Sequence, residues 1–423
     1  MLPDLSRFGK KFTAASGIVD LMEDLGSALL SNPDMLMLGG GTPARIGMVE
    51  AIYSRHLRAL VADDQSHYHL LGRYQSPAGD EAVRDQLAGL LNAEYGWPLD
   101  RHNIAITNGG QSAFSILANL LAGPMEDGSH KRVHFPLVPE YLGYADVGFS
   151  ENFFSATKPA LSLLPERRFK YHIDFDALSA GEALGPATGA LCLSRPTNPS
   201  GNILPLAELQ QLDTLAARHA IPLIIDAAYG LPFPGLHFDD SAAYWSDNTI
   251  LLLSLSKLGL PGLRSGFVVG SPELIEAFSR ANTILNLASG NAGPLFAASL
   301  MESGDLLKIP REILCPWYER KLESAQAAIL QALEQVPCHL HVTDGAFFLW
   351  LWFPELPLST TELYQQLKQE GVLVIPGDTA FPGLEEDWLH SRQCIRLSYA
   401  VEDDVMARAA EILGRVLRRL HGV

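Results

Sequence analysis

Short apolar runs that alternate with longer amphipathic stretches are the feature that most constrains the fold of this chain. We expect strands at residues 103–107, 132–137, 190–194, 222–226, 250–254 and 266–270, and helices between them at 111–121, 206–219 and 273–285. Strands that are apolar throughout are typical of a parallel sheet covered on both faces by helices. The pattern therefore predicts an α/β fold with a mostly parallel sheet.

The pattern changes after about residue 310. We expect a helix at 311–335, strands at 339–342, 347–353, 372–375 and 394–399, and helices near 360–370 and 402–420. This order predicts a smaller α+β unit with an antiparallel sheet. A chain of 423 residues is also too long for one simple core. We predict an N-terminal segment at 1–48 that packs with the small domain, a large α/β domain at 49–308 and a small domain at 309–423.

Composition excludes several classes of partner. The net charge of −17, from 31 basic and 48 acidic residues, argues against nucleic acid. No apolar stretch approaches the ~20 residues of a membrane helix, and the polar N-terminus does not resemble a signal peptide. The four scattered cysteines lack the spacing of a zinc site. We expect a cytoplasmic protein without a metal, a membrane partner or a nucleic-acid partner.

Ligands bind open α/β sheets at the carboxyl ends of the strands, so the residues that follow each apolar run are the candidate site residues. Gly109, Gly110 and Gln111 follow the first of these strands and open a helix. Glycines let the backbone approach an anion, and the free N–H groups at a helix start attract phosphate. An ordinary glycine turn explains the pattern equally well.

Tyr141 and Asn198 follow two further strands. The ring of Tyr141 could stack on a flat heteroaromatic cofactor, although a packed loop tyrosine would look the same in the sequence. Asn198 begins the turn sequence Asn-Pro-Ser-Gly. Its amide could bond a phenolate oxygen, whereas the proline and glycine are typical of any turn.

Asp226 ends a strongly apolar strand, and Tyr229 follows three residues later. A carboxylate in such surroundings needs a facing cation. A protonated pyridine nitrogen is one such cation, and the aspartate would keep the ring charged as an electron sink. A helix cap or a metal ligand is the alternative, but no carboxylate or histidine beside Asp226 completes a metal site.

Lys257 follows the apolar run at 250–253 and precedes a turn rich in glycine and proline that ends at Arg264. A buried lysine is costly unless its amine is neutral or covalently used. A Schiff base with pyridoxal phosphate (PLP) meets that condition, and Ser254 and Arg264 could then hold the phosphate. Taken alone, a strand-end lysine that reaches water explains the sequence as well.

Together these elements form an ordered series that resembles the fold-type I, PLP-dependent aminotransferases (class I/II) over nearly the whole chain. The series runs Gly-Gly-Gln, Tyr, Asn-Pro-x-Gly, Asp-x-x-Tyr, Ser-x-x-Lys and Arg, each at a separate expected strand end. Longer strings, such as Phe8-Gly-Lys-Lys-Phe12 and Gly345-Ala-Phe-Phe-Leu-Trp-Leu-Trp352, resemble the bacterial valine–pyruvate aminotransferases. The resemblance implies a large domain with a mostly parallel seven-stranded sheet and a smaller α+β domain built from both termini.

The resemblance also implies a role for each candidate. Lys257 would be the Schiff-base lysine, with Asp226 on the pyridine nitrogen and Tyr229 as the third catalytic residue. The cofactor would further be held by Gly109, Gly110, Gln111, Tyr141, Asn198, Ser254, Arg264 and Tyr74. Tyr74 resembles the tyrosine that reaches the phosphate from the neighbouring subunit, which implies a homodimer with shared active sites. Gly41, Asn198 and Arg396 would bind the substrate, with Arg396 on the α-carboxylate.

The activity implied is ping-pong transamination of a small aliphatic amino acid, L-valine plus pyruvate giving 2-oxoisovalerate plus L-alanine. Another PLP-dependent aminotransferase, a C–S lyase or a decarboxylase of the same fold stays open, because the cofactor stabilises a carbanion in each. A DNA-binding regulator fits the acidic chain poorly. A dehydrogenase also fits poorly, since no Gly-x-Gly-x-x-Gly follows an expected strand.

Overall fold

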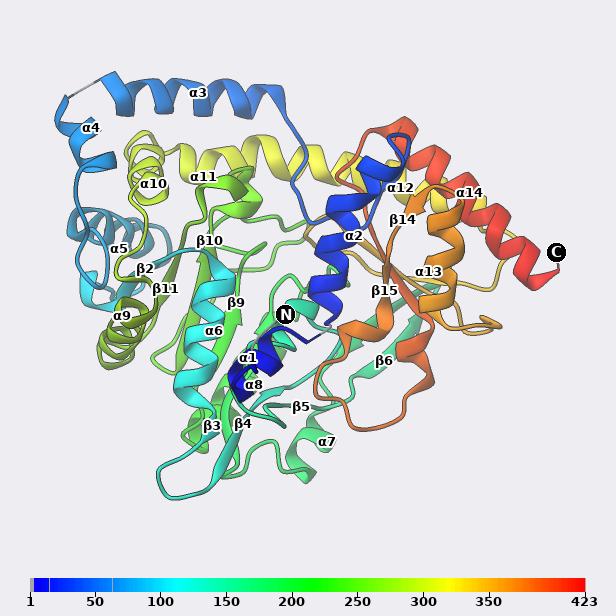
Figure 1. Cartoon of the computed structure of the whole chain (residues 1–423), viewed down its shortest axis with the longest axis horizontal. Helices are drawn as coiled ribbons and strands as arrows, with labels where there is room; N and C mark the ends of the chain where they lie inside the picture. Colours follow the sequence, from blue (N-terminus) through cyan, green and yellow to red (C-terminus); the bar gives the residue numbers. More distant parts are fainter. Residues whose placement is uncertain (1–3, 15, 63, 423) are drawn as a thin grey trace.

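A mostly parallel sheet forms the centre of the larger part of the molecule (Figure 1). The structure is a computed structural model that describes residues 4–14, 16–62 and 64–422. The spatial order of the strands is β2 (Ile104–Thr107), β11 (Gly266–Val269), β10 (Thr249–Ser254), β9 (Leu223–Asp226), β8 (Thr188–Ser194), β4 (His130–Phe135) and β3 (Gly123–Pro124), and β5 (Phe154–Ala156) pairs with β4. The α/β fold with a mostly parallel, seven-stranded principal sheet is confirmed, and the expected strand ends shift by only one or two residues.

Burial explains why these segments form strands. Every residue of β2, β8, β9, β10 and β11 is buried, so the apolar runs are covered on both faces. The strands from β10 to β5 pair in parallel, whereas β11 and β3 run antiparallel to their neighbours. The carboxyl ends of β8, β9 and β10 consequently lie side by side.

The helices include those expected from the sequence. They are α1 (Arg7–Phe12), α2 (Gly17–Ser31), α3 (Gly47–Ala62), α4 (Asp64–Leu71), α5 (Glu81–Tyr95), α6 (Gly110–Leu121), α7 (Phe175–Ala180), α8 (Leu206–Arg218), α9 (Pro272–Asn286), α10 (Ala292–Ser303), α11 (Asp305–Ile309), α12 (Cys315–Ala332), α13 (Thr360–Gln369) and α14 (Asp403–His421). The helix expected at 311–335 begins only at Cys315, because Pro310–Leu314 forms a wider π-helical turn. Pro310 has no N–H group to continue the ordinary helical bonding.

The second sheet has the order β15 (Ile375–Pro376), β16 (Cys394–Ser398), β13 (Phe348–Trp352), β12 (His339–His341), β7 (Arg168–His172) and β6 (Ala160–Leu164). The structure differs from the expected antiparallel sheet in one respect. The hairpin β6–β7 comes from the middle of the chain, and β7 pairs in parallel with β12. Lys170 of this hairpin also forms an ion pair with Asp344.

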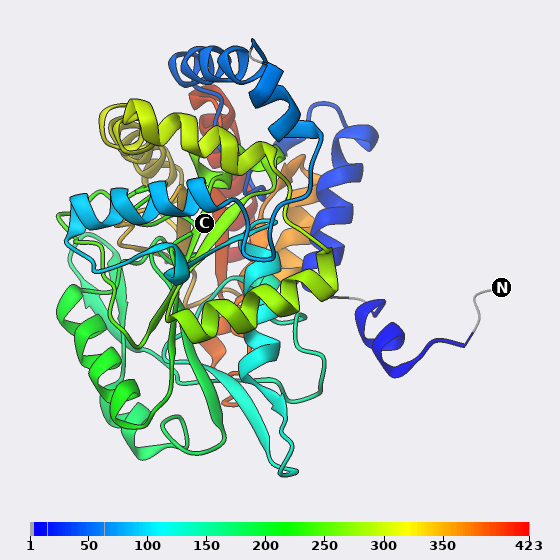
Figure 2. The same ribbon diagram turned by 90° about the vertical axis from the view of Figure 1, so that its left-hand side faces the viewer.

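The N-terminal segment is attached to the C-terminal part of the chain. The short strand β1 (Leu36–Met37) pairs in parallel with β14 (Val372–Leu373), where the sequence predicted one longer strand at 372–375. Asp24 of α2 accepts hydrogen bonds from Lys368 Nζ, at 2.8 Å, and from the Tyr364 hydroxyl. Figure 2 shows that α1, by contrast, lies at the edge of the molecule, where its Phe8 and Phe12 rings contact Phe149. Within the described residues, no helix is long and apolar enough to cross a membrane.

The close packing of β8 yields a stability prediction. A Cβ atom at Gly189 would lie 1.9 Å from the carbonyl oxygen of Leu121, a contact that only a backbone shift can relieve. We expect Gly189→Ala to destabilise the protein by about 1–3 kcal/mol, seen as a lower Tm in thermal unfolding. The matched control is Gly89→Ala in α5, where nothing lies within 4 Å. A Gly189→Ala protein with the Tm of this control would contradict the prediction.

Candidate functional site

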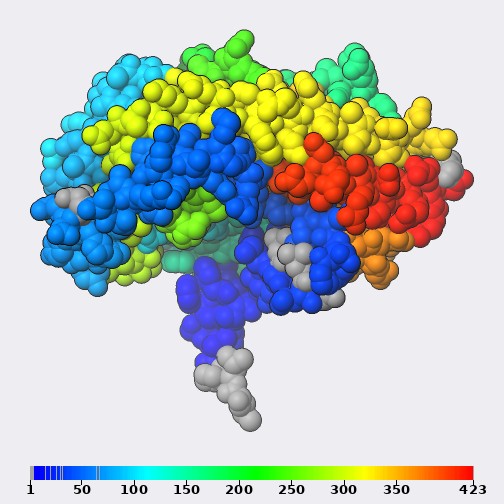
Figure 3. Space-filling model, turned by 90° about the horizontal axis from the view of Figure 1, so that it is seen from above, coloured from blue at the N-terminus to red at the C-terminus, as the bar shows by residue number. Residues whose placement is uncertain are grey.

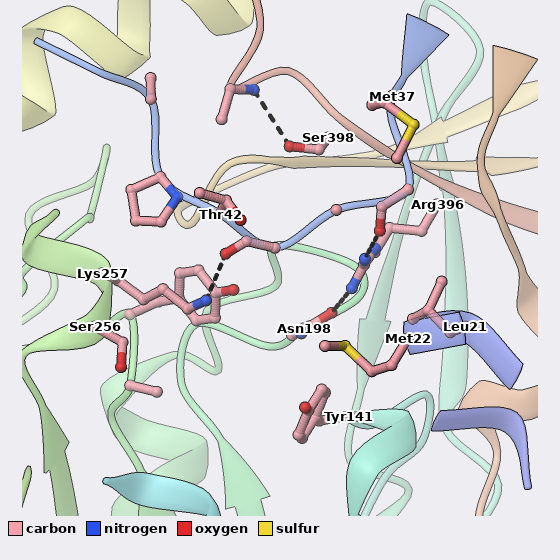
Figure 4. Close-up of a pocket in the computed structure, with 18 of the residues that line it drawn as sticks. Leu21, Met22, Met37, Thr42, Tyr141, Asn198, Ser256, Lys257, Arg396 and Ser398 are labelled. Carbon is pink, nitrogen blue, oxygen red and sulfur yellow. Dashed lines mark hydrogen bonds between the residues drawn. The ribbon is translucent and has the colours of Figure 1, made fainter. Parts of the chain in front are cut away.

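A cavity of about 1240 Å³ opens where the carboxyl ends of β8, β9 and β10 meet β16 and α2 (Figure 4). Among the residues predicted from the sequence, it is lined by Gly41, Gly110, Gln111, Tyr141, Asn198, Asp226, Tyr229, Ser254, Lys257, Arg264 and Arg396. Gly109 directly precedes Gly110 in the chain. A Cβ atom added to Gly109 would lie 2.8 Å from the Arg264 guanidinium. Tyr74 is 80% exposed and does not line the cavity of its own chain. The structure therefore gathers most of the predicted residues around one space.

Lys257 lies in a 3₁₀ turn directly after β10, with its amine inside the cavity. Nζ donates a hydrogen bond of 2.6 Å to the carbonyl oxygen of Gly41 (Figure 4). It also lies 5.2 Å and 5.8 Å from the ring centres of Tyr229 and Phe347. Burial, together with the charges of Arg396 and Arg264, lowers the pKa of Lys257 to about 8. Its amine therefore reaches the neutral, basic form far more readily than an ordinary lysine.

Asp226 ends β9 and is buried, and both of its oxygens have hydrogen-bond donors. The Tyr144 hydroxyl donates to Oδ2, and the backbone N–H of Ala228 donates to Oδ1 at 2.8 Å. Burial raises the pKa of Asp226, and these two hydrogen bonds oppose that shift. In the described part of the chain no cation lies within ion-pair distance of this carboxylate. The carboxylate thus has the surroundings that a protonated ring nitrogen would complete.

Arg396 of β16 is a buried cation that the described residues leave without a carboxylate partner. Nη1 donates to Asn198 Oδ1 at 2.7 Å and Nη2 donates to the Gly39 carbonyl at 2.6 Å (Figure 4). The guanidinium carbon lies 4.2 Å from the ring centre of Phe348, and Nε is buried without a hydrogen bond. Burial lowers the pKa of Arg396 to about 10. An unpaired guanidinium in this setting suits a bidentate carboxylate from a ligand.

The start of α6 suits an anion. The helix begins at Gly110, and its cap residue Gly109 has a φ of 96° and supplies no side-chain hydrogen bond. The first N–H groups of the helix therefore lack a side-chain cap, and Gly110 and Gln111 face the cavity together with Arg264. A phosphate group fits this position, because uncapped N–H groups and a guanidinium both donate to its oxygens.

The sequence did not indicate two further contributions to the cavity. Ile18, Leu21 and Met22 of α2 line it together with Met37, and Figure 4 places Leu21, Met22 and Met37 around the side chain of Arg396. The helical spacing of Ile18, Leu21 and Met22 is that of any core-facing stripe. The strings at 21–25 and 37–44 also resemble the valine–pyruvate aminotransferases, but this does not indicate which of their side chains line a site. The second contribution is the hydrogen bond that the Tyr144 hydroxyl donates to Asp226, a contact between segments 82 positions apart that no local pattern predicts.

Comparison with known proteins decides the family. Residues 55–413 match the family described as aminotransferase class I and II. The chain belongs to this family. Its members use pyridoxal phosphate, and the predicted family is confirmed. Among the residues that the structure describes, no group of three or more histidine, cysteine, aspartate or glutamate side chains could hold a metal ion.

The chain is also similar to individual aminotransferases over nearly its whole length. The chain is 44% identical over 414 residues to a valine–pyruvate aminotransferase of Escherichia coli (strain K12), a match that covers 98% of each protein. It is similar to the crystal structure of a putative amino-acid aminotransferase from Psychrobacter arcticum 273-4, with a TM-score of 0.96, 40% identity and 99% of both chains covered. A valine–pyruvate aminotransferase from Salmonella typhimurium LT2 matches with a TM-score of 0.87, 42% identity and coverage of 96% and 100%.

The hydrogen bond from Tyr144 to Asp226 gives a testable prediction. A hydrogen bond to a charged group contributes about 1.5–3 kcal/mol, so we expect Tyr144→Phe to lower kcat/KM for the amino donor by about 10–100-fold. The fold should persist, because the ring stays in place. The matched control is Tyr244→Phe, which removes an equivalent hydrogen bond to Asp213 outside the cavity. Equal kcat/KM values in the two variants would show that the hydrogen bond from Tyr144 to Asp226 does not assist the reaction.

Proposed function

We propose that this protein binds pyridoxal phosphate and transfers the amino group of L-valine to pyruvate, giving 2-oxoisovalerate and L-alanine in two half-reactions. The observation that carries the proposal is the pairing of two unusual groups in one cavity. Lys257 has a lowered pKa, and Arg396 is a buried cation without a carboxylate partner among the described side chains. A base and an anion site for the same amino acid are what transamination requires.

The residues around the cavity fit the cofactor. Lys257 would bond it covalently, and Asp226 would face its ring nitrogen, where a cation would offset the burial of the carboxylate. The start of α6, with Ser254 and Arg264, would hold its phosphate. Tyr141 would lie against the ring, and Asn198 and Tyr229 would face its phenolic oxygen. When bound, pyridoxal phosphate supplies an electron-withdrawing ring that stabilises negative charge on the substrate Cα.

Arg396 would bind the α-carboxylate that amino acids and 2-oxo acids share. Its hydrogen bonds to Asn198 and Gly39 already hold the guanidinium in the cavity, so little side-chain entropy remains to be lost on binding. Leu21, Met22 and Met37 provide an apolar wall for an aliphatic side chain. Because one methylene changes binding by about 1–3 kcal/mol, we expect related aliphatic amino acids to react more slowly than valine.

The amine of Lys257 would move the proton of the substrate Cα. A general base works best when its pKa lies near the operating pH, and a pKa of about 8 meets this condition. The carbonyl of Gly41 orients the amine by accepting its hydrogen bond. The ring of Tyr229, which lines the cavity, lies 5.2 Å from Nζ and limits the space for water beside it.

We also propose a homodimer with shared active sites. The exposed apolar side chains of α3, α4 and the end of α9 are Met48, Leu57, Val61, Tyr68, Leu71, Ile284, Leu285 and Leu287. Figure 3 shows α3 lying open on one face of the molecule. Apolar side chains in such numbers are typical of a protein interface. Tyr74 follows α4 and is exposed, which is the placement expected of a residue that serves a neighbouring subunit.

The cytoplasmic location of the protein stays a prediction.

An absorbance titration tests the activity. We expect the purified protein to show a visible cofactor band that L-valine converts to the amine form and pyruvate restores. Lys257→Ala should abolish this cycle, whereas Lys308→Ala, an exposed lysine outside the cavity, should leave it unchanged. A band that valine leaves unmoved would contradict the valine assignment. Ammonia release without a 2-oxo acid would instead identify a lyase.

Mixing two variants tests the shared site. Lys257→Ala removes the base, and we expect Tyr74→Ala to weaken cofactor binding. If Tyr74 serves the neighbouring subunit, mixed dimers of the two variants contain one intact site, and activity returns when the subunits exchange. Each variant alone, subjected to the same exchange, is the control. Absence of recovery in mixtures that demonstrably contain mixed dimers would show that Tyr74 does not act across the interface.

A further inference from the structure

A second cavity of about 220 Å³ adjoins the first. The two cavities share the loop at 42–45 and Lys257, so this loop and the lysine form the wall between them. We call the second space the rear cavity. Its other lining residues are Ile46, Val49, Glu50, Tyr53, Leu258, Gly259, Pro261, Leu314 and Tyr318.

Two tyrosine hydroxyls hold the wall of the rear cavity in place. The Tyr318 hydroxyl accepts a hydrogen bond of 2.9 Å from the backbone N–H of Ala44. The Tyr53 hydroxyl donates a hydrogen bond of 2.6 Å to the carbonyl of Leu258, the residue after Lys257. Both rings are buried. The loop and the lysine are therefore fixed from the rear side, and the hydroxyls supply polar surface there.

The rear cavity also reaches solvent. Arg45 and Glu50 line it and form an ion pair of 2.7 Å, with side-chain exposures of 87% and 49%. Water needs about 10–15 Å³ of cavity and a few polar partners, so this space has room for several molecules. The tyrosine hydroxyls and the Glu50 carboxylate provide such partners. The rear cavity thus suits a chain of water from the protein surface to Lys257.

Any exchange of the Lys257 hydrogens with solvent would have to take place on the rear side. On the substrate side, its amine donates to the Gly41 carbonyl, and the ring of Tyr229 lies 5.2 Å away. Under the proposed function, the cofactor and the amino acid occupy that same side while the proton moves. A proton held on Nζ at that moment can exchange with solvent only through water that arrives from elsewhere.

We propose that the rear cavity holds the water that exchanges hydrogens with Lys257 Nζ during transamination, an inference that rests on the proposed function. The neutral amine accepts the Cα proton and becomes an ammonium group with three hydrogens, one of them from the substrate. Exchange with rear water replaces that hydrogen with one from solvent and leaves the charge unchanged. The proton that Lys257 gives up next then comes from water.

Val49 provides a test, because it lines the rear cavity and not the substrate cavity. Val49→Phe and the smaller change Val49→Met would fill the space, and Val49→Ala would enlarge it. The holoenzyme is given [2-²H]valine and pyruvate in ordinary water, and the deuterium at Cα of the alanine formed is measured by mass spectrometry. We expect the filled variants to retain deuterium about twofold or more above wild type, because water is excluded. Val49→Ala should not exceed wild type.

A crystal structure of each variant supplies a readout that does not depend on turnover. Ordered water in the rear cavity of the wild type, and its loss in Val49→Phe or Val49→Met, would support the inference together with the deuterium result. Equal deuterium retention in wild type and in a folded variant whose rear cavity is dry would overturn it. A wild-type protein that transfers no amino group would overturn the proposed function instead.

Discussion

The burial of Arg396 is the constraint on which the site depends. Its guanidinium, on a strand of the second sheet, donates to Asn198 after β8 of the first sheet and to Gly39 of the N-terminal segment. One cation therefore joins three parts of the chain that lie far apart in the sequence. Burying a charge without an opposite charge is costly, so the surrounding structure must stabilise it. The protein keeps an anion-binding group ready at the cost of some stability.

The principal sheet could be predicted from the sequence because its strands are apolar throughout and bounded by helices. The hairpin β6–β7 could not be predicted in the same way. Its second strand, Arg168–His172, alternates charged or polar with buried aromatic residues, which predicts a half-exposed strand but no partner. Its pairing with β12 depends on where the C-terminal part of the chain lies, and no local pattern contains that information.

The candidate site was predictable to the extent that its residues follow strand ends in order. Lys257, Asp226 and Asn198 each succeed an apolar run, and the parallel sheet brings those ends together. The contributions of Tyr144 to the site and of Tyr318 to the loop beside it were not predictable. Each acts through a contact between distant segments, such as the bond from Ala44 to Tyr318, and each has a sequence pattern of ordinary core.

The shared edge between β7 and β12 has a consequence for synthesis. Lys170 and its ion-pair partner Asp344 are separated by 174 positions, so the ribosome completes the hairpin long before its neighbouring strand exists. During that interval the hairpin presents an unpaired edge, the kind of surface that invites association with other chains. Arg168 and Lys170 place positive charges on that edge strand. Charges on an edge strand discourage such association, so Arg168 and Lys170 protect the hairpin from pairing with other chains until β12 has been synthesised.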